Sequence, residues 1–241
     1  MNKSIKLISY NLFKGRVWWS GRSALNEMAE LIQGYEPDLV FFQEIRGFVE
    51  EKKALRERFH QHLGLNHVYY GKNYVGKGND HGNAIYARGE MLGAENFDLT
   101  VSKLERRGLV SSHCEPWGKA DPLYLFCTHL DLSEGNRKKQ LEKLGDRLEA
   151  ILPRPSTPFI LAGDFNDWRK GADRYLFERF GLAEAFRTRA GKLAKSFPSL
   201  YPMLELDRVY FRGLEVKEAR VLSEGFRMLS DHLPLFVEFQ R

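Results

Sequence analysis

Residues with the chemistry of metal ligands and acid–base catalysts recur where apolar segments of this 241-residue chain begin or end. Four segments end on such residues, which are Asn11, Glu44, His129 and the pair Asp164 and Asn166. Two further segments are opened or preceded by them, and these residues are Asp207 and the adjacent Asp231 and His232. Gathered in one place, such carboxylate, amide and imidazole groups would bind a hard cation, activate water and stabilise a developing negative charge.

The placement of these residues at segment ends predicts that they converge. If the two segments that begin with polar residues run antiparallel to the four that end with them, all six groups meet along one sheet edge. Asp164 and Asn166 are two positions apart, so they face the same way in an extended segment. Asp231 and His232 are adjacent and can serve one site only in a turn, which the flanking serine and proline favour.

Each of these residues also has a purely structural interpretation. Glu44 could pair with Arg46 or Lys52 on the surface, His129 could be a buried structural histidine, and the asparagines could form turns. The Asp-His pair before Leu233 could simply cap a turn. These interpretations would all have to hold at once, and they do not explain why every polar residue stands at a strand terminus. The convergent site is therefore the better interpretation.

The segments that carry these residues alternate between strand and helix patterns. Nearly continuous apolar runs predict strands buried on both faces, at Ile5–Asn11, Leu39–Glu44, Gly82–Arg88, Leu109–Cys114, Leu123–His129, Pro158–Asn166, Leu206–Phe211 and Leu233–Phe239. Helical spacing of apolar residues predicts helices at Arg22–Gly34 and at Ser133–Leu152, the second with Ser133 as its N-cap. No repeat or long linker divides the chain, which predicts one α/β domain over residues 1–241.

Composition narrows the class of protein further. With 43% hydrophobic, 29% charged and 13% aromatic residues, the chain is globular, neither disordered nor collagen-like. No apolar run reaches about 20 residues, and no signal peptide opens the sequence, so we expect a cytoplasmic protein. Cys114 and Cys127 are expected to be reduced residues on neighbouring strands. The net charge of +5 is compatible with a polyanionic substrate.

Seven short motifs, in order along the chain, resemble the endonuclease/exonuclease/phosphatase superfamily, which contains pancreatic deoxyribonuclease. They are Ser9-Tyr10-Asn11, Gln43-Glu44, His81-Gly82-Asn83-Ala84, Thr128-His129-Leu130, Gly163-Asp164-Phe165-Asn166, Leu206-Asp207-Arg208 and Ser230-Asp231-His232. The compact length and the segment from Gly163 to Trp168 resemble a small bacterial branch of this superfamily. The resemblance implies an α/β fold with two mixed β-sheets packed face to face and helices outside, a four-layer α/β sandwich.

The resemblance also implies Mg²⁺-dependent hydrolysis of a phosphate ester, with Mn²⁺ as a substitute. Glu44 is a hard carboxylate suited to Mg²⁺, Asn11 offers a neutral oxygen and Asp231 a further ligand. The ion would polarise the phosphate and stabilise the leaving oxygen.

The remaining motif residues are expected to perform the chemistry. Asp164 would orient or deprotonate the attacking water, and Asn166 would donate a hydrogen bond to a phosphate oxygen. His232 would sit over the phosphate while Asp207 fixes its tautomer and favours its charged form. His129 would be a second acid–base or phosphate-stabilising group. Asn83 is expected to buttress this set and bind substrate.

The choice of substrate depends on loops. Abasic-site endonucleases of the superfamily carry a tyrosine motif where this chain has Thr128-His129, which argues against an abasic-site repair role. Trp18 and Trp19, set among cations, could stack on bases, insert at a lipid interface or pack on the fold, and packing is favoured because tryptophan is usually buried. Arg107 is the better candidate for a phosphate contact, and Arg137–Lys139 is expected to be a solvated helix face.

Three functional hypotheses follow from this pattern. A phosphodiesterase acting on nucleic acid fits the basic charge, the aromatic loop and His129. The alternative is a phospholipid or inositol-phosphate hydrolase, with a lipid headgroup as its partner. A non-catalytic phosphate-binding or scaffold protein is the third, and the complete set of site residues argues against it. The sequence indicates no protein partner.

Overall fold

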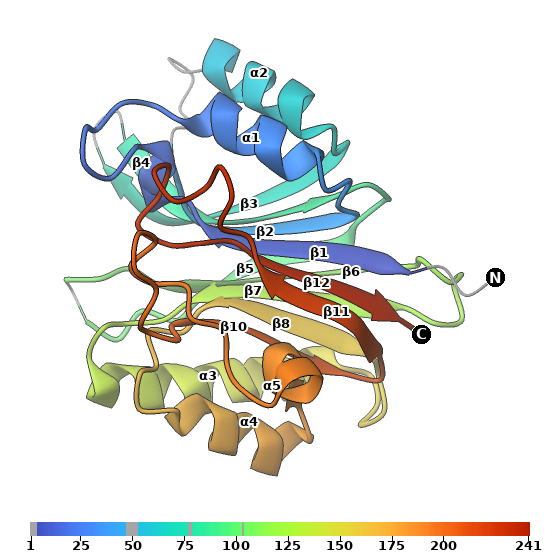
Figure 1. Ribbon diagram of the computed structural model, residues 1–241. Coiled ribbons are helices and arrows are strands. Elements are labelled where there is room, and N and C mark those ends of the chain that lie inside the picture. The colour runs from blue at the N-terminus through green and yellow to red at the C-terminus, as the bar shows by residue number, and fades with distance from the viewer. Residues whose placement is uncertain (1–3, 47–52, 77–78, 103) are drawn as a thin grey trace.

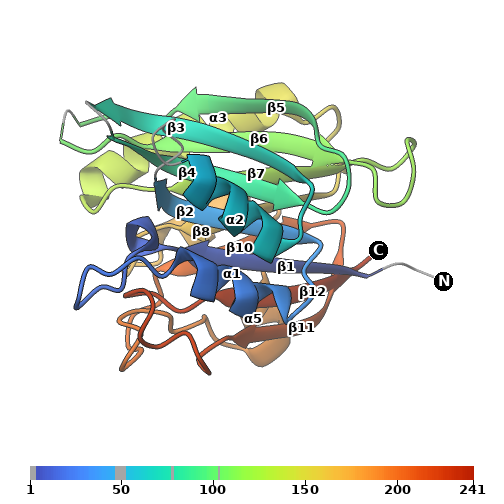
Figure 2. The ribbon, with the colours of Figure 1, turned by 90° about the horizontal axis from the view of Figure 1, so that it is seen from above.

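Two six-stranded mixed β-sheets face each other in the computed structural model, which describes residues 4–46, 53–76, 79–102 and 104–241. Helices cover the outer face of each sheet (Figure 1). The view from above shows α1 (Leu25–Gln33) and α2 (Lys53–Leu63) lying across the first sheet (Figure 2). The second sheet is covered by α3 (Glu134–Ile151) and α4 (Gly171–Phe180). The expected four-layer α/β sandwich is confirmed.

The first sheet carries the N-terminal strand at its centre. β1 runs parallel to β2 and antiparallel to β12, and β2 pairs antiparallel with β4. In spatial order its strands are β11 (Glu215–Val221), β12 (Leu235–Gln240), β1 (Ile5–Asn11), β2 (Leu39–Arg46), β4 (Asn79–Ala87) and β3 (His67–Gly76).

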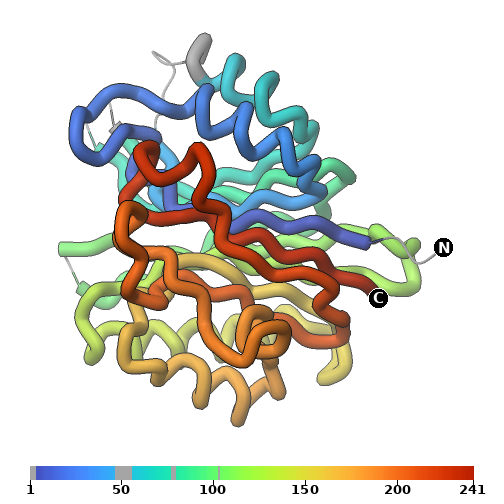
Figure 3. The backbone as a smooth tube through the Cα atoms, viewed as in Figure 1, coloured from blue at the N-terminus to red at the C-terminus, as the bar shows by residue number. Residues whose placement is uncertain are grey.

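The second sheet repeats this arrangement. β7 and β8 are parallel at its centre, and β10 runs antiparallel to β8. In spatial order its strands are β5 (Leu92–Asp98), β6 (Gly108–Cys114), β7 (Leu123–His129), β8 (Phe159–Asp164), β10 (Asp207–Arg212) and β9 (Ala183–Glu184). The strand directions bring together the ends of β1, β2, β7 and β8 and the starts of β10 and β12. We call this the site edge, and the two chain termini lie at the opposite edge (Figure 3).

Strand residues alternate between two apolar layers. Leu7 and Phe41 lie in the core between the sheets, whereas the neighbouring Ile8 and Phe42 pack under α1 and α2. The central strands are therefore buried on both faces, as their apolar sequences predict. A third core holds α3 and α4 on the second sheet. Cys114 and Cys127 are buried, unbridged and on the adjacent strands β6 and β7, which confirms the prediction for them.

The prediction for the start of α3 was only partly correct. Ser133 occupies the N-cap position, but its side chain makes no capping hydrogen bond. The Asp131 carboxylate stabilises the start of the helix instead, because it accepts hydrogen bonds from the Ser133 N–H at 2.7 Å and from Asn136 Nδ2 at 3.1 Å. None of the helices in the described ranges combines the length and apolar content needed to cross a bilayer. The cytoplasmic location stays a prediction.

Candidate active site

Asp164, Asp207 and His232 form a buried cluster at the site edge. Asp164 ends β8, and Asp207 opens β10 directly opposite it in the antiparallel register. His232 enters from the turn before β12, with Nδ1 2.8 Å from Asp207 Oδ2 and Nε2 3.7 Å from Asp164 Oδ2. The His232 imidazole, which the turn before β12 of the first sheet carries, therefore lies between two carboxylates of the second sheet.

This geometry shifts the pKa values of the imidazole and of one carboxylate. Burial alone would lower the pKa of His232, but the Asp207 and Asp164 carboxylates outweigh it and raise that pKa to about 10. Burial, together with the nearby Asp207 charge, raises the pKa of Asp164 to about 6, although His232 acts against this rise. At neutral pH, His232 is thus a cation and Asp164 a carboxylate whose pKa lies close to neutrality.

His129 is joined to this cluster through Asn166. Asn166 Nδ2 donates to the Leu130 carbonyl at 3.0 Å and lies 3.1 Å from His129 Nε2. Burial, reinforced by the charges of Arg107 and His232, holds the pKa of His129 well below its ordinary value. The Nε2 atom of the neutral His129 ring therefore faces both Asn166 Nδ2 and, at 3.4 Å, Asp164 Oδ2.

The extended conformation expected from Asp164 to Asn166 was wrong, because the segment turns sharply. β8 ends at Asp164, Asn166 has a φ of 49°, and the Asn166 N–H donates to Asp164 Oδ1 at 3.0 Å. Asparagine tolerates this left-handed backbone, and the carboxylate–amide hydrogen bond closes the turn. The turn nevertheless brings both side chains into the site.

Asn11, at the end of β1, supports the cluster from the first sheet. Its Nδ2 donates to Asp164 Oδ2 at 3.0 Å, and its Oδ1 accepts from the Phe13 N–H at 3.1 Å. Ser230 Oγ in turn donates to the Asn11 carbonyl at 2.7 Å and accepts from the His232 N–H at 3.3 Å. Asn11, His129, Asp164, Asn166, Asp207 and His232 are thus linked in one chain of contacts.

Glu44 lies at a β-bulge in β2 with a φ of 52°. Its Oε2 is buried without a hydrogen-bond partner and lies 3.8 Å from Lys14 Nζ. The ion pair in the structure is therefore with Lys14 and not with Arg46, while Lys52 lies outside the described residues. A buried carboxylate oxygen with no hydrogen bond fits a divalent cation.

Asp231, the other carboxylate expected to bind the metal, is half-buried, which raises its pKa, and its Oδ1 accepts from Ser230 Oγ at 3.3 Å. Asp164, Asp207 and His232 also have ligand atoms within 4.8 Å of one another, as a metal site would. His232 Nδ1 and Asp207 Oδ2, however, already contact each other at 2.8 Å, whereas Glu44 Oε2 has no hydrogen-bond partner. The donor chemistry therefore favours Glu44 over this cluster as the principal ligand.

The two residues expected to bind substrate lie at the periphery of the site. Asn83 Nδ2 donates to the Gly108 carbonyl at 3.0 Å and so joins the two sheets, while its Oδ1 is buried without a partner. Arg107 donates from Nε to the Leu130 carbonyl at 3.1 Å and pairs with Glu105 at 2.8 Å. Arg107 is close enough to lower the pKa of His129, but its charge is shared with Glu105.

Two residues that the sequence analysis did not identify hold Asp207 in place. Ser196 Oγ donates to Asp207 Oδ2. Arg208 is fully buried and donates to the carbonyls of Asp207 at 3.2 Å and Asp167 at 3.3 Å, which ties the start of β10 to the loop after β8. An arginine inside the apolar strand 206–211 was the signal that could have revealed this role.

One expectation about these aromatic and basic residues was wrong, and another was only partly correct. Trp18 and Trp19 are 40% and 60% exposed, so they do not pack into the fold. Of the expected solvated helix face, Lys138 and Lys139 are exposed. Arg137 is buried, because its guanidinium donates to the Asp131 carbonyl at 3.1 Å and lies 4.5 Å from the ring centre of Trp168.

Comparison with known proteins places this geometry in a family. The model of the endonuclease/exonuclease/phosphatase family matches residues 8–232. The uncharacterized protein YbhP of Escherichia coli is 32% identical over 244 residues, which cover 98% of this chain and 96% of YbhP.

Solved structures share the fold at lower identity. An endonuclease/exonuclease/phosphatase from Beutenbergia cavernae has a TM-score of 0.79 at 18% identity, covering 98% of this chain and 71% of that one. The human Nocturnin catalytic domain with bound sulfate has a TM-score of 0.77 at 19% identity, covering 99% and 96%. From the family match and the full-length relative, we conclude that the chain belongs to the endonuclease/exonuclease/phosphatase family.

Proposed function

We propose that residues 1–241 form a single Mg²⁺-dependent phosphodiesterase domain that hydrolyses its substrate by direct attack of water. The family typically hydrolyses phosphate esters and generally depends on divalent metal ions. One observation carries the proposal: the His232 imidazole is held between the Asp207 carboxylate at 2.8 Å and the Asp164 carboxylate at 3.7 Å, which favours its charged form. A fixed buried cation beside a carboxylate with a pKa of about 6 suits an anionic ester and a water nucleophile.

Each of the hydrogen-bonded residues of the site then has a defined role in the hydrolysis. Asp164 accepts a proton from the attacking water, for which a pKa of about 6 is well matched to neutral pH. His232 donates from Nε2 to a phosphate oxygen, while Asp207 keeps Nδ1 protonated and the ring oriented. Asn166 and His129 line the same side of Asp164 and stabilise the transition state.

Glu44 would hold the metal ion, with Asn11 and Asp231 as further oxygen donors. The bound ion supplies polarisation of the phosphate and stabilisation of the leaving oxygen. The unpartnered Oε2 of Glu44 supports this assignment.

The reaction is tested with bis-p-nitrophenyl phosphate and p-nitrophenyl phosphate as soluble diester and monoester. We expect Mg²⁺-dependent diester hydrolysis that stops in EDTA and falls at least about 10³-fold in Asp164→Ala. Asp121→Ala is the matched control, because Asp121 pairs with Arg241 away from the site edge. Metal-independent turnover, or equal turnover by Asp164→Ala, would contradict the mechanism.

Two substrate classes fit this chemistry. Nucleic acid is favoured by the net charge of +5 and by Lys14 and Arg107, whose charges both reach His129. Cleavage of plasmid DNA that falls steeply with salt would support it. A phospholipid is the alternative, and the exposed apolar side chains of the site edge favour it over nucleic acid.

A further inference from the structure

Large apolar side chains are exposed almost entirely at the site edge. In the described part of the chain, thirteen such side chains are exposed, and eleven of them lie in loops or strand ends at this edge. The most exposed are Leu104 (94%), Tyr201 (78%), Val75 (70%), Met203 (65%), Trp19 (60%) and Leu132 (54%). The exceptions are Val68 at the start of β3 and Phe177 on α4.

Strand topology places these residues around the active site. Trp19 follows β1, Leu132 follows β7, Val75 ends β3 and Leu104 precedes β6. Because β4 is antiparallel to β2, and β6 to β7, the turns before β4 and β6 lie at the same edge as the ends of β1 and β7. These loops project from the left side of the molecule in Figure 1. We call these exposed side chains the apolar rim.

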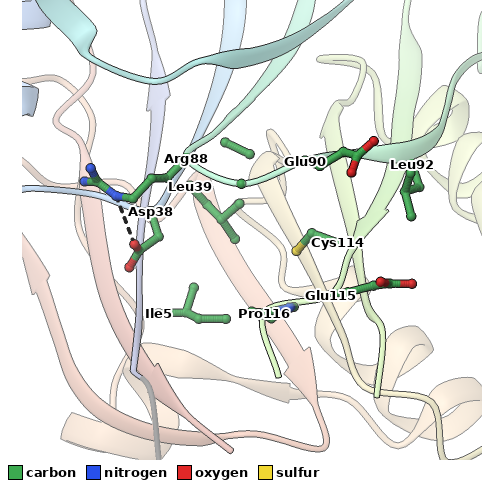
Figure 4. A pocket seen from close by; sticks show the side chains of 11 residues that line it. Ile5, Asp38, Leu39, Arg88, Glu90, Leu92, Cys114, Glu115 and Pro116 are labelled. Carbon is green, nitrogen blue, oxygen red and sulfur yellow. Dashed lines mark hydrogen bonds and ion pairs between the residues drawn. The ribbon is translucent and has the colours of Figure 1, made fainter. Parts of the chain in front are cut away.

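The opposite edge provides an internal comparison. Among the described residues, its loops carry no exposed large apolar side chain, and its strand ends carry only Val68, at the start of β3. It holds a cavity of about 450 Å³ whose charged lining is mainly acidic, with Asp38, Glu90 and Glu115 against Arg88 (Figure 4). Scattered exposed apolar residues are ordinary on protein surfaces, but a concentration of them at one edge marks an interaction surface.

Cations accompany the apolar rim. Arg16, Arg106 and Lys195 are exposed in three of its loops, and within the described chain none of them forms an ion pair. Lys195 directly precedes Ser196, whose hydroxyl contacts Asp207, so the loop that carries Lys195 adjoins the active site. The apolar rim thus combines exposed cations with exposed apolar side chains, and a partner that fits it is both anionic and apolar.

The composition of the apolar rim distinguishes between two anionic partners. Bases of a single strand would stack on Trp19 or Tyr201. Bases make little favourable contact with aliphatic side chains such as Val75, at the end of β3, and Leu104 and Leu132, in their loops. An anionic bilayer accommodates both kinds of residue, because aliphatic tips enter the acyl boundary, tryptophan and tyrosine lie at headgroup level and cations meet lipid phosphates.

We propose that the site edge docks on an anionic lipid bilayer and presents the active site to the phosphodiester of a lipid headgroup. A hollow of about 500 Å³ beside the site gives the headgroup a mainly basic slot, because its charged lining is Lys72, Arg106 and Arg107 against the single carboxylate of Asp98. Arg107 and Asn166 donate to the same Leu130 carbonyl, so this slot adjoins the catalytic groups. Only headgroup turnover rests on the proposed function, because docking requires no catalysis.

Docking is tested by sedimentation with phosphatidylcholine vesicles, with and without phosphatidylglycerol. We expect the protein to sediment with the anionic vesicles and the affinity to fall at least about tenfold in the triple variant Val75→Ser/Leu104→Ser/Leu132→Ser. Phe177→Ser is the matched control, since Phe177 is 67% exposed but lies on α4 away from the apolar rim. Circular dichroism checks that each variant is folded.

Asp164→Ala separates docking from catalysis, because it should bind vesicles as the wild type does while hydrolysing nothing. Failure to bind anionic vesicles, or equal binding by the triple variant, would overturn the proposal. So would a single-stranded oligonucleotide that binds the wild type tightly and the triple variant weakly. None of these outcomes depends on the bis-p-nitrophenyl phosphate assay, so the two proposals can fail independently.

Discussion

Asp207→Asn removes the charge that keeps His232 protonated while preserving the shape of the side chain. Asp207 Oδ2 lies 2.8 Å from His232 Nδ1, and its carboxylate is the strongest influence that raises the pKa of His232. A contacting opposite charge moves a pKa by about 1–3. We therefore expect the pKa of His232 to fall from about 10 toward its ordinary value of 6.5.

The stability change can be derived from the same pair. The pKa of His232 is about 10 in the folded state and 6.5 in the unfolded chain. At about 1.4 kcal/mol per pKa unit, this difference adds about 5 kcal/mol to the free energy of unfolding. Because the folded pKa is raised, this contribution is complete below pH 6.5 and is lost as the pH rises through 10. Between pH 6 and pH 9 the wild type loses about 3 kcal/mol of this stabilisation, whereas the free energy of unfolding of Asp207→Asn should change little from this source.

Two measurements check this reasoning. Urea unfolding of wild type and Asp207→Asn at pH 6 and pH 9 should show the stability difference shrinking as the pH rises, and Asp121→Asn should show no such trend. NMR titration of the His232 ring should find it protonated at pH 8 in the wild type only. A wild-type ring that titrates below pH 7 would refute the argument.

Further predictions concern the other site residues and one buried carboxyl. Glu44→Gln should raise the Mg²⁺ concentration for half-maximal hydrolysis at least about tenfold in a metal titration, with the unfolding curve unchanged. His232→Ala should lower kcat about 10³-fold in the diester assay. It should also lower the free energy of unfolding, because it removes the cation between two buried carboxylates, so circular dichroism must first establish that the variant is folded. Burial raises the pKa of Glu184 to about 7, so its stabilisation is lost as the pH rises through 7. Glu184→Gln should therefore be up to about 3 kcal/mol more stable than wild type in urea at pH 8 and no more stable at pH 4.5.

Much of the central fold and of the site follows from the sequence. Strands such as 5–11 and 123–129 are buried on both faces, so their apolar runs mark them clearly, and the predicted bounds match β1 and β7. Their last residues, Asn11 and His129, then fall at the site edge because the strands are central and parallel to a neighbour. The convergence predicted from strand ends is present in the structure.

The features that escaped prediction depend on tertiary contacts. β3 and β5 lie at the ends of their sheets and are partly exposed, so their mixed polar sequences lack the apolar signal. The left-handed backbone of Asn166 is set by its hydrogen bond to Asp164, which periodicity does not reveal. Arg208 is buried because three peptide carbonyls surround its guanidinium and Asp173 Oδ1 lies 3.7 Å from its Nε. An arginine inside an apolar strand marks this position, but the partners that surround it come from distant parts of the chain.

The hydrogen bonds from Asn11 to Asp164 and between His232 and Asp207 have a mechanical consequence, because they fasten the two sheets together at the active site. Asn11 and His232 move with the first sheet, whereas Asp164 and Asp207 move with the second. Sliding one sheet past the other by about 1 Å would misalign donor and acceptor, and displacements of that size can cost about 10²-fold in rate. Catalytic rate should thus respond to shear between the sheets before global unfolding begins, so that apolar substitutions between the sheets slow the enzyme while it remains folded.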